Sequence, residues 1–146
     1  MKPALPLIVR VGDRRVEQAR RALGEALAEQ RAADNRRAQA ARLFQQSEIW
    51  AQEADSDLRA QPQCEQRQLL REVRGRDVVR AQGELHAAED AFAAAKMVTQ
   101  SASQALLRAE TRANEFARLL RRQRAQAAEQ AALREEDDLC GRVKAF

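Results

Sequence analysis

The side chains that could do chemistry in this 146-residue chain are few, and they lie far apart. His86 is the only histidine, and Cys64 and Cys140 are the only cysteines, so no pair has the spacing of zinc ligands. The scattered glycines form no phosphate-binding loop; they stand at positions 12, 24, 75, 83 and 141. We therefore expect no catalytic residue, no cofactor and no metal site, and leave any role of the two cysteines open.

The composition is typical of long helices. Charged residues make up 33% of the chain, aromatic residues only 3%, and Tyr is absent. Disorder is the competing interpretation, but the abundance of strong helix formers argues against it. No run of about 18 apolar residues is present, so we expect no membrane insertion. The first residues, MKPALPLIVRV, lack the form of a secretory signal, so we expect a soluble, cytoplasmic protein.

One proline divides the chain. Pro62 lies in RAQPQCEQ, between two periodic segments, and predicts a turn near residues 61–64. Asp13 is a candidate N-cap and Gly141 a candidate helix stop, so we expect helices over about 13–60 and 64–138. Residues 1–12 are expected to be irregular, and residues 13–146 to form a single hairpin. Cys64 and Cys140 would then be about 110 Å apart, too far for a disulfide within one chain.

The second helix carries a seven-residue repeat. Its a positions run from Val78 to Ala127 and include Phe92, whereas most of its d positions from Ala81 onward are alanine. A strict heptad held over this length is typical of a left-handed coiled coil.

The first helix follows the same repeat less regularly. Its a positions run from Val16 to Leu58, and its d positions are mostly alanine. Gln30 and Arg37 are polar residues at a positions. They either specify the register at a cost in stability or mark a shift of register.

These patterns predict an all-α fold: a long antiparallel two-helix coiled-coil hairpin. Facing alanine stripes let the helices approach towards the lower end of the usual 8–10 Å spacing. The helices differ in length, so the first should end opposite about residue 110. The second should then continue without a partner for some 25–30 residues, or about 40 Å. A two-helix hairpin offers no desolvated cleft for a general acid or base, so we expect no enzyme activity.

A basic cluster precedes an acidic tail on this overhanging helix. Residues 99–127 hold six Arg and two Glu, whereas Glu135, Glu136, Asp137 and Asp138 follow in a run. The cluster is a solvated helix face or a binding site for an acidic protein surface. Its members are Arg118, Arg121, Arg122 and Arg124. We expect no nucleic-acid binding, because no aromatic residues interleave with the arginines and the acidic tail follows closely.

Large apolar residues gather on both sides of the turn, beyond what the a and d positions require. They include Leu43, Ile49, Trp50, Leu70 and Val73. An exposed Trp is favoured in protein interfaces, so this group is a candidate partner-binding surface. The alternative is that Trp50 simply lies across the facing helix near Val73 and Val78.

The unequal helices, the turn at Pro62 in RAQPQC and the basic RLLRRQR segment resemble the FliJ/YscO family over residues 12–138. These are central stalk proteins of flagellar and virulence type III secretion systems in bacteria. The resemblance implies that the end bearing the termini inserts into a hexameric ATPase ring, with Arg118–Arg124 as the contact. It also implies that the turn reaches the export gate, at the cytoplasmic side of the inner-membrane export apparatus. The alternatives are an export chaperone or escort that binds secretion chaperones, and a purely structural dimeric coiled coil.

Overall fold

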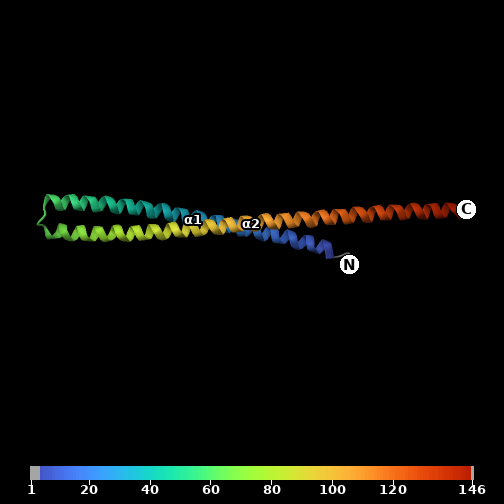
Figure 1. The fold of residues 1–146 in the computed structure, drawn as a ribbon, viewed down its shortest axis with the longest axis horizontal. Helices are drawn as coiled ribbons and strands as arrows, with labels where there is room; N and C mark the ends of the chain where they lie inside the picture. Colours follow the sequence, from blue (N-terminus) through green and yellow to red (C-terminus); the bar gives the residue numbers. More distant parts are fainter. Residues whose placement is uncertain (1–3, 146) are drawn as a thin grey trace. The chain divides into compact units, whose positions relative to one another are not determined.

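The computed structural model describes residues 4–145, which form two helices (Figure 1). α1 spans Ala4–Ala60 and α2 spans Glu65–Lys144. No strand occurs within residues 4–145. The described part of the chain is therefore all-α with hairpin-like packing, and the prediction of an all-α fold is confirmed.

The first helix begins earlier than the sequence pattern predicted. It starts at Ala4, so the predicted N-cap at Asp13 is wrong, and so is the predicted irregular segment over residues 4–12. Residues 1–3 of that segment lie outside the described range. Pro6 lies in the first turn, where a missing N–H costs no helical hydrogen bond. Gly12 lies within this helix as well, and no glycine among the described residues adopts a positive φ.

The second helix also ends later than predicted. It runs through Gly141 to Lys144, so the stop assigned to residues 138–141 is wrong. A glycine ends a helix most readily when it adopts a left-handed conformation, and Gly141 has no positive φ. The amide of Ala145 still bonds to the carbonyl of Gly141 at 3.2 Å, which continues the helical pattern.

Residues 61–64 separate the helices at the place that Pro62 indicates. The amide of Gln61 bonds to the carbonyl of Asp57, and the amide of Cys64 to that of Gln61, both at 3.2 Å. The Arg67 guanidinium also donates to the Asp57 carbonyl oxygen at 2.8 Å. Gln68 Nε2 donates to the Pro62 carbonyl oxygen at 2.9 Å. Side chains from the start of α2 thus satisfy carbonyls at the end of α1 and in the turn.

The residues group into two units. The turn unit comprises Leu23–Ala102 and contains the connection between the helices. The terminal unit comprises the residues up to Ala22 and those from Ser103 onward. Each unit contains a portion of α1 and a portion of α2, so each has its own helix-on-helix packing.

In the turn unit, residues progressively earlier in α1 contact residues progressively later in α2. Asp55 pairs with Arg71 at 2.7 Å. Arg37 lies over the Phe92 ring, and the Thr99 hydroxyl donates to the Ala26 carbonyl oxygen at 3.2 Å. The two helix portions therefore lie face to face along their length (Figure 1).

Small residues form the most buried part of this packing. Ala33 is 2% exposed and Ala54 is 3% exposed, and Ala26, Ala81 and Ser47 are also buried. These are the predicted d positions, so the sequence correctly identified the stripe that loses contact with water. Gln30 and Arg37, which occupy a positions, are half-buried as well. The pattern of burial therefore continues through them without a shift.

The terminal unit repeats this pattern with a thinner core. Val16 and Ala113 are buried, and Gly12 lies close enough to Ala113 that an added Cβ would sit 3.6 Å from its Cα. Arg20 bonds to Glu110 at 3.4 Å. Every residue from Arg124 to Ala145 is exposed. This C-terminal segment (residues 124–145) starts later than predicted, because α1 extends further at its N-terminal end.

Candidate partner-binding surfaces

Reactive groups do not gather anywhere in residues 4–145. No three His, Cys, Asp or Glu side chains within this range lie close enough to hold a metal ion. His86 is exposed and reaches only Glu89, at 3.6 Å. Cys64 is half-buried and Cys140 exposed, and both are free thiols.

The turn patch comprises five apolar residues that the sequence singled out and that the structure leaves exposed. They are Leu43, Ile49, Trp50, Leu70 and Val73. Trp50 is 42% exposed, and its ring lies under the Arg74 guanidinium at 4.8 Å from the ring centre. Trp50 thus meets the facing helix through a cation. One part of the ring is held in place, and the rest remains available for a partner.

Leu43 and Trp50 are seven residues apart, so they lie on one stripe of α1, beside the buried a and d positions. Leu70 and Val73 are three residues apart and neighbour each other on α2. Leu43 is 59% exposed and Leu70 41%. Exposed apolar residues on both helices near the turn are candidates for contact with a partner protein.

The basic segment (residues 118–124) lies in the terminal unit, in the last part of α2 before its residues become fully exposed. Its four arginines are exposed, and no ion pair in the described range involves them. At 100° per residue they cover about 160° of the helix circumference. Arg124 also borders a hollow of about 410 Å³ with Pro6 and Leu120. The segment presents a broad positive surface.

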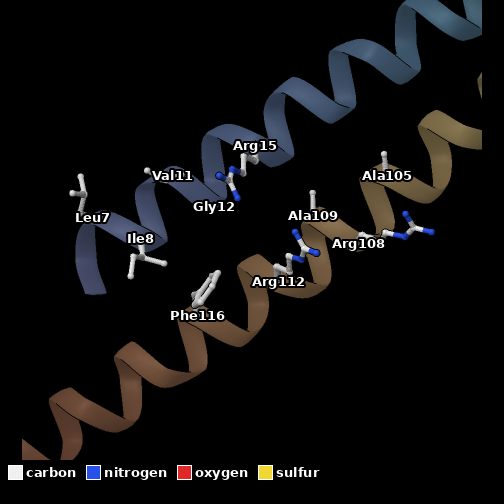
Figure 2. Close-up of a pocket in the computed structure, with 10 residues that line it drawn as sticks. All are labelled: Leu7, Ile8, Val11, Gly12, Arg15, Ala105, Arg108, Ala109, Arg112 and Phe116. Carbon is white, nitrogen blue, oxygen red and sulfur yellow. The ribbon is translucent and has the colours of Figure 1, made fainter. Parts of the chain in front are cut away.

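A groove between α1 and α2 in the terminal unit was missed by the sequence analysis (Figure 2). Its volume is about 630 Å³. Leu7, Ile8 and Val11 line it from α1, and the Phe116 ring points towards Ile8 from α2 (Figure 2). Arg15, Arg108 and Arg112 also line it, so an apolar floor meets three positive charges. We call this the arginine-rimmed groove.

The groove escaped prediction because residues 1–12 were expected to be irregular. One signal could have revealed it: Leu5, Val9 and Gly12 continue the a and d spacing upstream of Val16. Leu5 and Val9 are indeed half-buried, and Gly12 is buried. Leu7, Ile8 and Val11 then fall beside this stripe, which is why they remain exposed.

No helix in residues 4–145 is both long enough and apolar enough to cross a membrane. The chain matches no protein-family model, no curated protein and no solved structure.

Proposed function

We propose that the protein is a non-enzymatic stalk or adaptor of a type III secretion export apparatus. In this proposal α1 and α2 form an antiparallel coiled-coil hairpin. Its terminal end enters the ring of the hexameric secretion ATPase, and its turn end contacts an export gate protein on the cytoplasmic side of the inner membrane. The protein does no bond chemistry and acts through its surfaces.

The observation that carries this proposal is the change along α2 near residue 124. The a and d positions of α2 are buried or half-buried from Val78 to Gln123, and every described residue that follows is exposed. The basic segment lies where this packing ends, so its arginines are placed to contact an acidic-lined opening. The resemblance to the FliJ/YscO stalk proteins supports the same assignment.

The turn patch supports a second contact. Its apolar residues and the partly exposed Trp50 suit a protein interface, because aromatic anchors supply much of the energy of such interfaces. We assign this patch to the export gate. The alternative assignment is a secretion chaperone held by an escort protein, which would use the turn patch and not need the basic segment.

The ATPase contact is tested by charge reversal at Arg118, Arg121, Arg122 and Arg124. The variant with all four changed to Glu should lose capture of the cognate ATPase and its stimulation, because an acidic surface would repel it. Arg and Glu have similar helix propensities, so the helix should persist. The matched control reverses four exposed arginines of the turn unit. These are Arg31, Arg42, Arg76 and Arg80.

Full ATPase binding by the basic-segment variant would refute the ring contact. If that variant also retained a secretion chaperone, and Trp50→Ala released it, the escort alternative would hold. If the control variant lost ATPase capture to the same extent, the net charge of the chain, and not this segment, would explain the loss.

A further inference from the structure

Two parts of α2 in the terminal unit carry opposite net charges. One of them packs on α1, and the other is exposed. Residues 103–122 contain five Arg and two Glu, a net charge of +3. Residues 128–140 contain five acidic residues and one Arg, a net charge of −4. The basic part borders the arginine-rimmed groove, whereas the acidic part is fully exposed. One helix therefore holds both halves of a complementary pair.

The acidic part cannot reach the groove of its own chain. Both belong to the continuous helix α2, and Arg112 and Asp137 are separated by about 38 Å of helix. A second copy of the chain can supply it. We propose that two copies associate through antiparallel pairing of their C-terminal α2 helices, with the acidic segment of each lying in the arginine-rimmed groove of the other.

A single stripe of α2 joins the two regions. Its residues follow one another at alternating spacings of four and three, which places them on one helix face. They are Arg112, Phe116, Leu119, Gln123, Gln126, Gln130, Leu133 and Asp137. Leu119 is 49% exposed and Leu133 is 54% exposed, so these two leucines are available to a partner, whereas Phe116 is half-buried and lines the groove.

The order of residues in this stripe is self-complementary when the helix is reversed. Placing the two-fold axis between Gln123 and Gln126 sets Phe116 against the Leu133 of the second copy. The same alignment sets Arg112 against Asp137, so an apolar pair and an ion pair form together. A two-fold interface uses each such pair twice.

The groove explains why the acidic segment would lie beside α1 as well as α2. Arg15 and Arg108 flank the groove together with Arg112, so they are placed to meet Glu136 and Asp137 of the second copy. Leu7, Ile8 and Val11 provide apolar surface for Leu133. Figure 2 shows Arg15 on α1 and Arg112 on α2 among the residues that line this groove.

Like charges limit the strength of this association. Arg122 flanks this stripe next to the two-fold axis, on the same side as the Arg122 of the second copy. The ion pairs at the groove are exposed and screened by salt. The dimer should therefore form at high protein concentration and weaken as ionic strength rises. The inference goes beyond the proposed function and does not depend on it.

The first test is a charge swap followed by analytical ultracentrifugation. One variant carries Arg108→Glu and Arg112→Glu, and the other carries Glu136→Arg and Asp137→Arg. Each alone should bind itself roughly tenfold more weakly than the wild-type chain, or worse, because like charges meet at both grooves. Mixing the two should restore association, because every groove then meets an opposite charge. Arg76→Glu with Arg80→Glu, in the turn unit, is the matched control.

The second test is a disulfide between copies. In a Cys64→Ser background, Ala109→Cys should form a covalent dimer with the native Cys140 on mild oxidation, because the alignment places residue 109 against residue 140. The two positions are about 46 Å apart along one helix, so no bond can form within a chain. Thr111→Cys, on another face of α2, is the control and should not form the dimer.

A wild-type chain that stays monomeric up to about 1 mM would overturn the proposal. So would an association that both charge variants leave unchanged, or equal disulfide yields from positions 109 and 111. Loss of ATPase capture in the basic-segment experiment would leave this result untouched, because that test concerns different residues.

Discussion

The guanidinium carbon of Arg37 lies 4.1 Å from the centre of the Phe92 ring, across the packing of α1 on α2. Both residues occupy a positions of the seven-residue repeat. Arg37 also bonds to Asp34 on its own helix, at 2.6 Å. An arginine is accommodated at a half-buried position because its planar group stacks on the ring while its edge meets a carboxylate.

Separating these two contacts gives the first prediction. Phe92→Leu keeps apolar volume but removes the ring face, so a double-mutant cycle with Arg37→Ala should give a coupling of about 0.5–2 kcal/mol. The exposed Asp34 contact should contribute less, about 0.2–0.5 kcal/mol. Urea unfolding of the wild type, the two single variants and the double variant of each pair measures both values. A coupling near zero for Arg37 and Phe92 would show that the stacking does not stabilise the fold.

The second prediction concerns the small residues between the helices. Ala33 is 2% exposed, so Ala33→Leu should lower the free energy of unfolding by about 1–3 kcal/mol, because the added atoms force the helices apart. Ala28 is exposed on the same helix, and Ala28→Leu is the control, with an expected change near zero. Thermal unfolding followed by circular dichroism compares the two. Equal effects would mean that close approach of the helices is not required.

The third prediction concerns glycines inside the helices. A Cβ added at Gly24 or Gly83 would meet nothing within 4 Å, and neither residue has a positive φ. Gly24→Ala and Gly83→Ala should therefore each stabilise the protein by about 0.5–1 kcal/mol, through the higher helix propensity of alanine. The effects should add, because the sites share no contacts. Denaturation midpoints that fall on substitution would contradict this expectation.

The fourth prediction concerns the connection between α1 and α2. Arg67→Ala removes the donor to the Asp57 carbonyl oxygen, and should cost about 0.5–1.5 kcal/mol. The loss should be local, so hydrogen exchange should accelerate near residues 57–68 and not near the termini. Arg59→Ala is the control, since Arg59 is exposed and makes no hydrogen bond within the described range. Uniformly faster exchange would indicate that the turn controls global stability instead.

Local chemistry was enough to predict the helical class, the break at Pro62 and the stripe that becomes buried. Alanine and leucine recur at spacings that only a helix brings to one face, and a proline within a polar stretch cannot continue it. The sequence left the exposure of Trp50 open, because a residue beside that stripe either faces solvent or lies across the facing helix. The helix ends were not predictable from Asp13 and Gly141, because capping preferences are weaker than the packing of whole helices.

The sequence by itself determined which residues are helical over most of the chain and which positions face the partner helix, since both follow from local periodicity. Only the tertiary structure decided that α1 extends to Ala4 and so creates the arginine-rimmed groove. It also decided that Arg37 lies over Phe92 and that Trp50 meets Arg74. Those features depend on which residues of two distant helix portions meet, and the alignment of one helix against the other is set by packing across the whole interface.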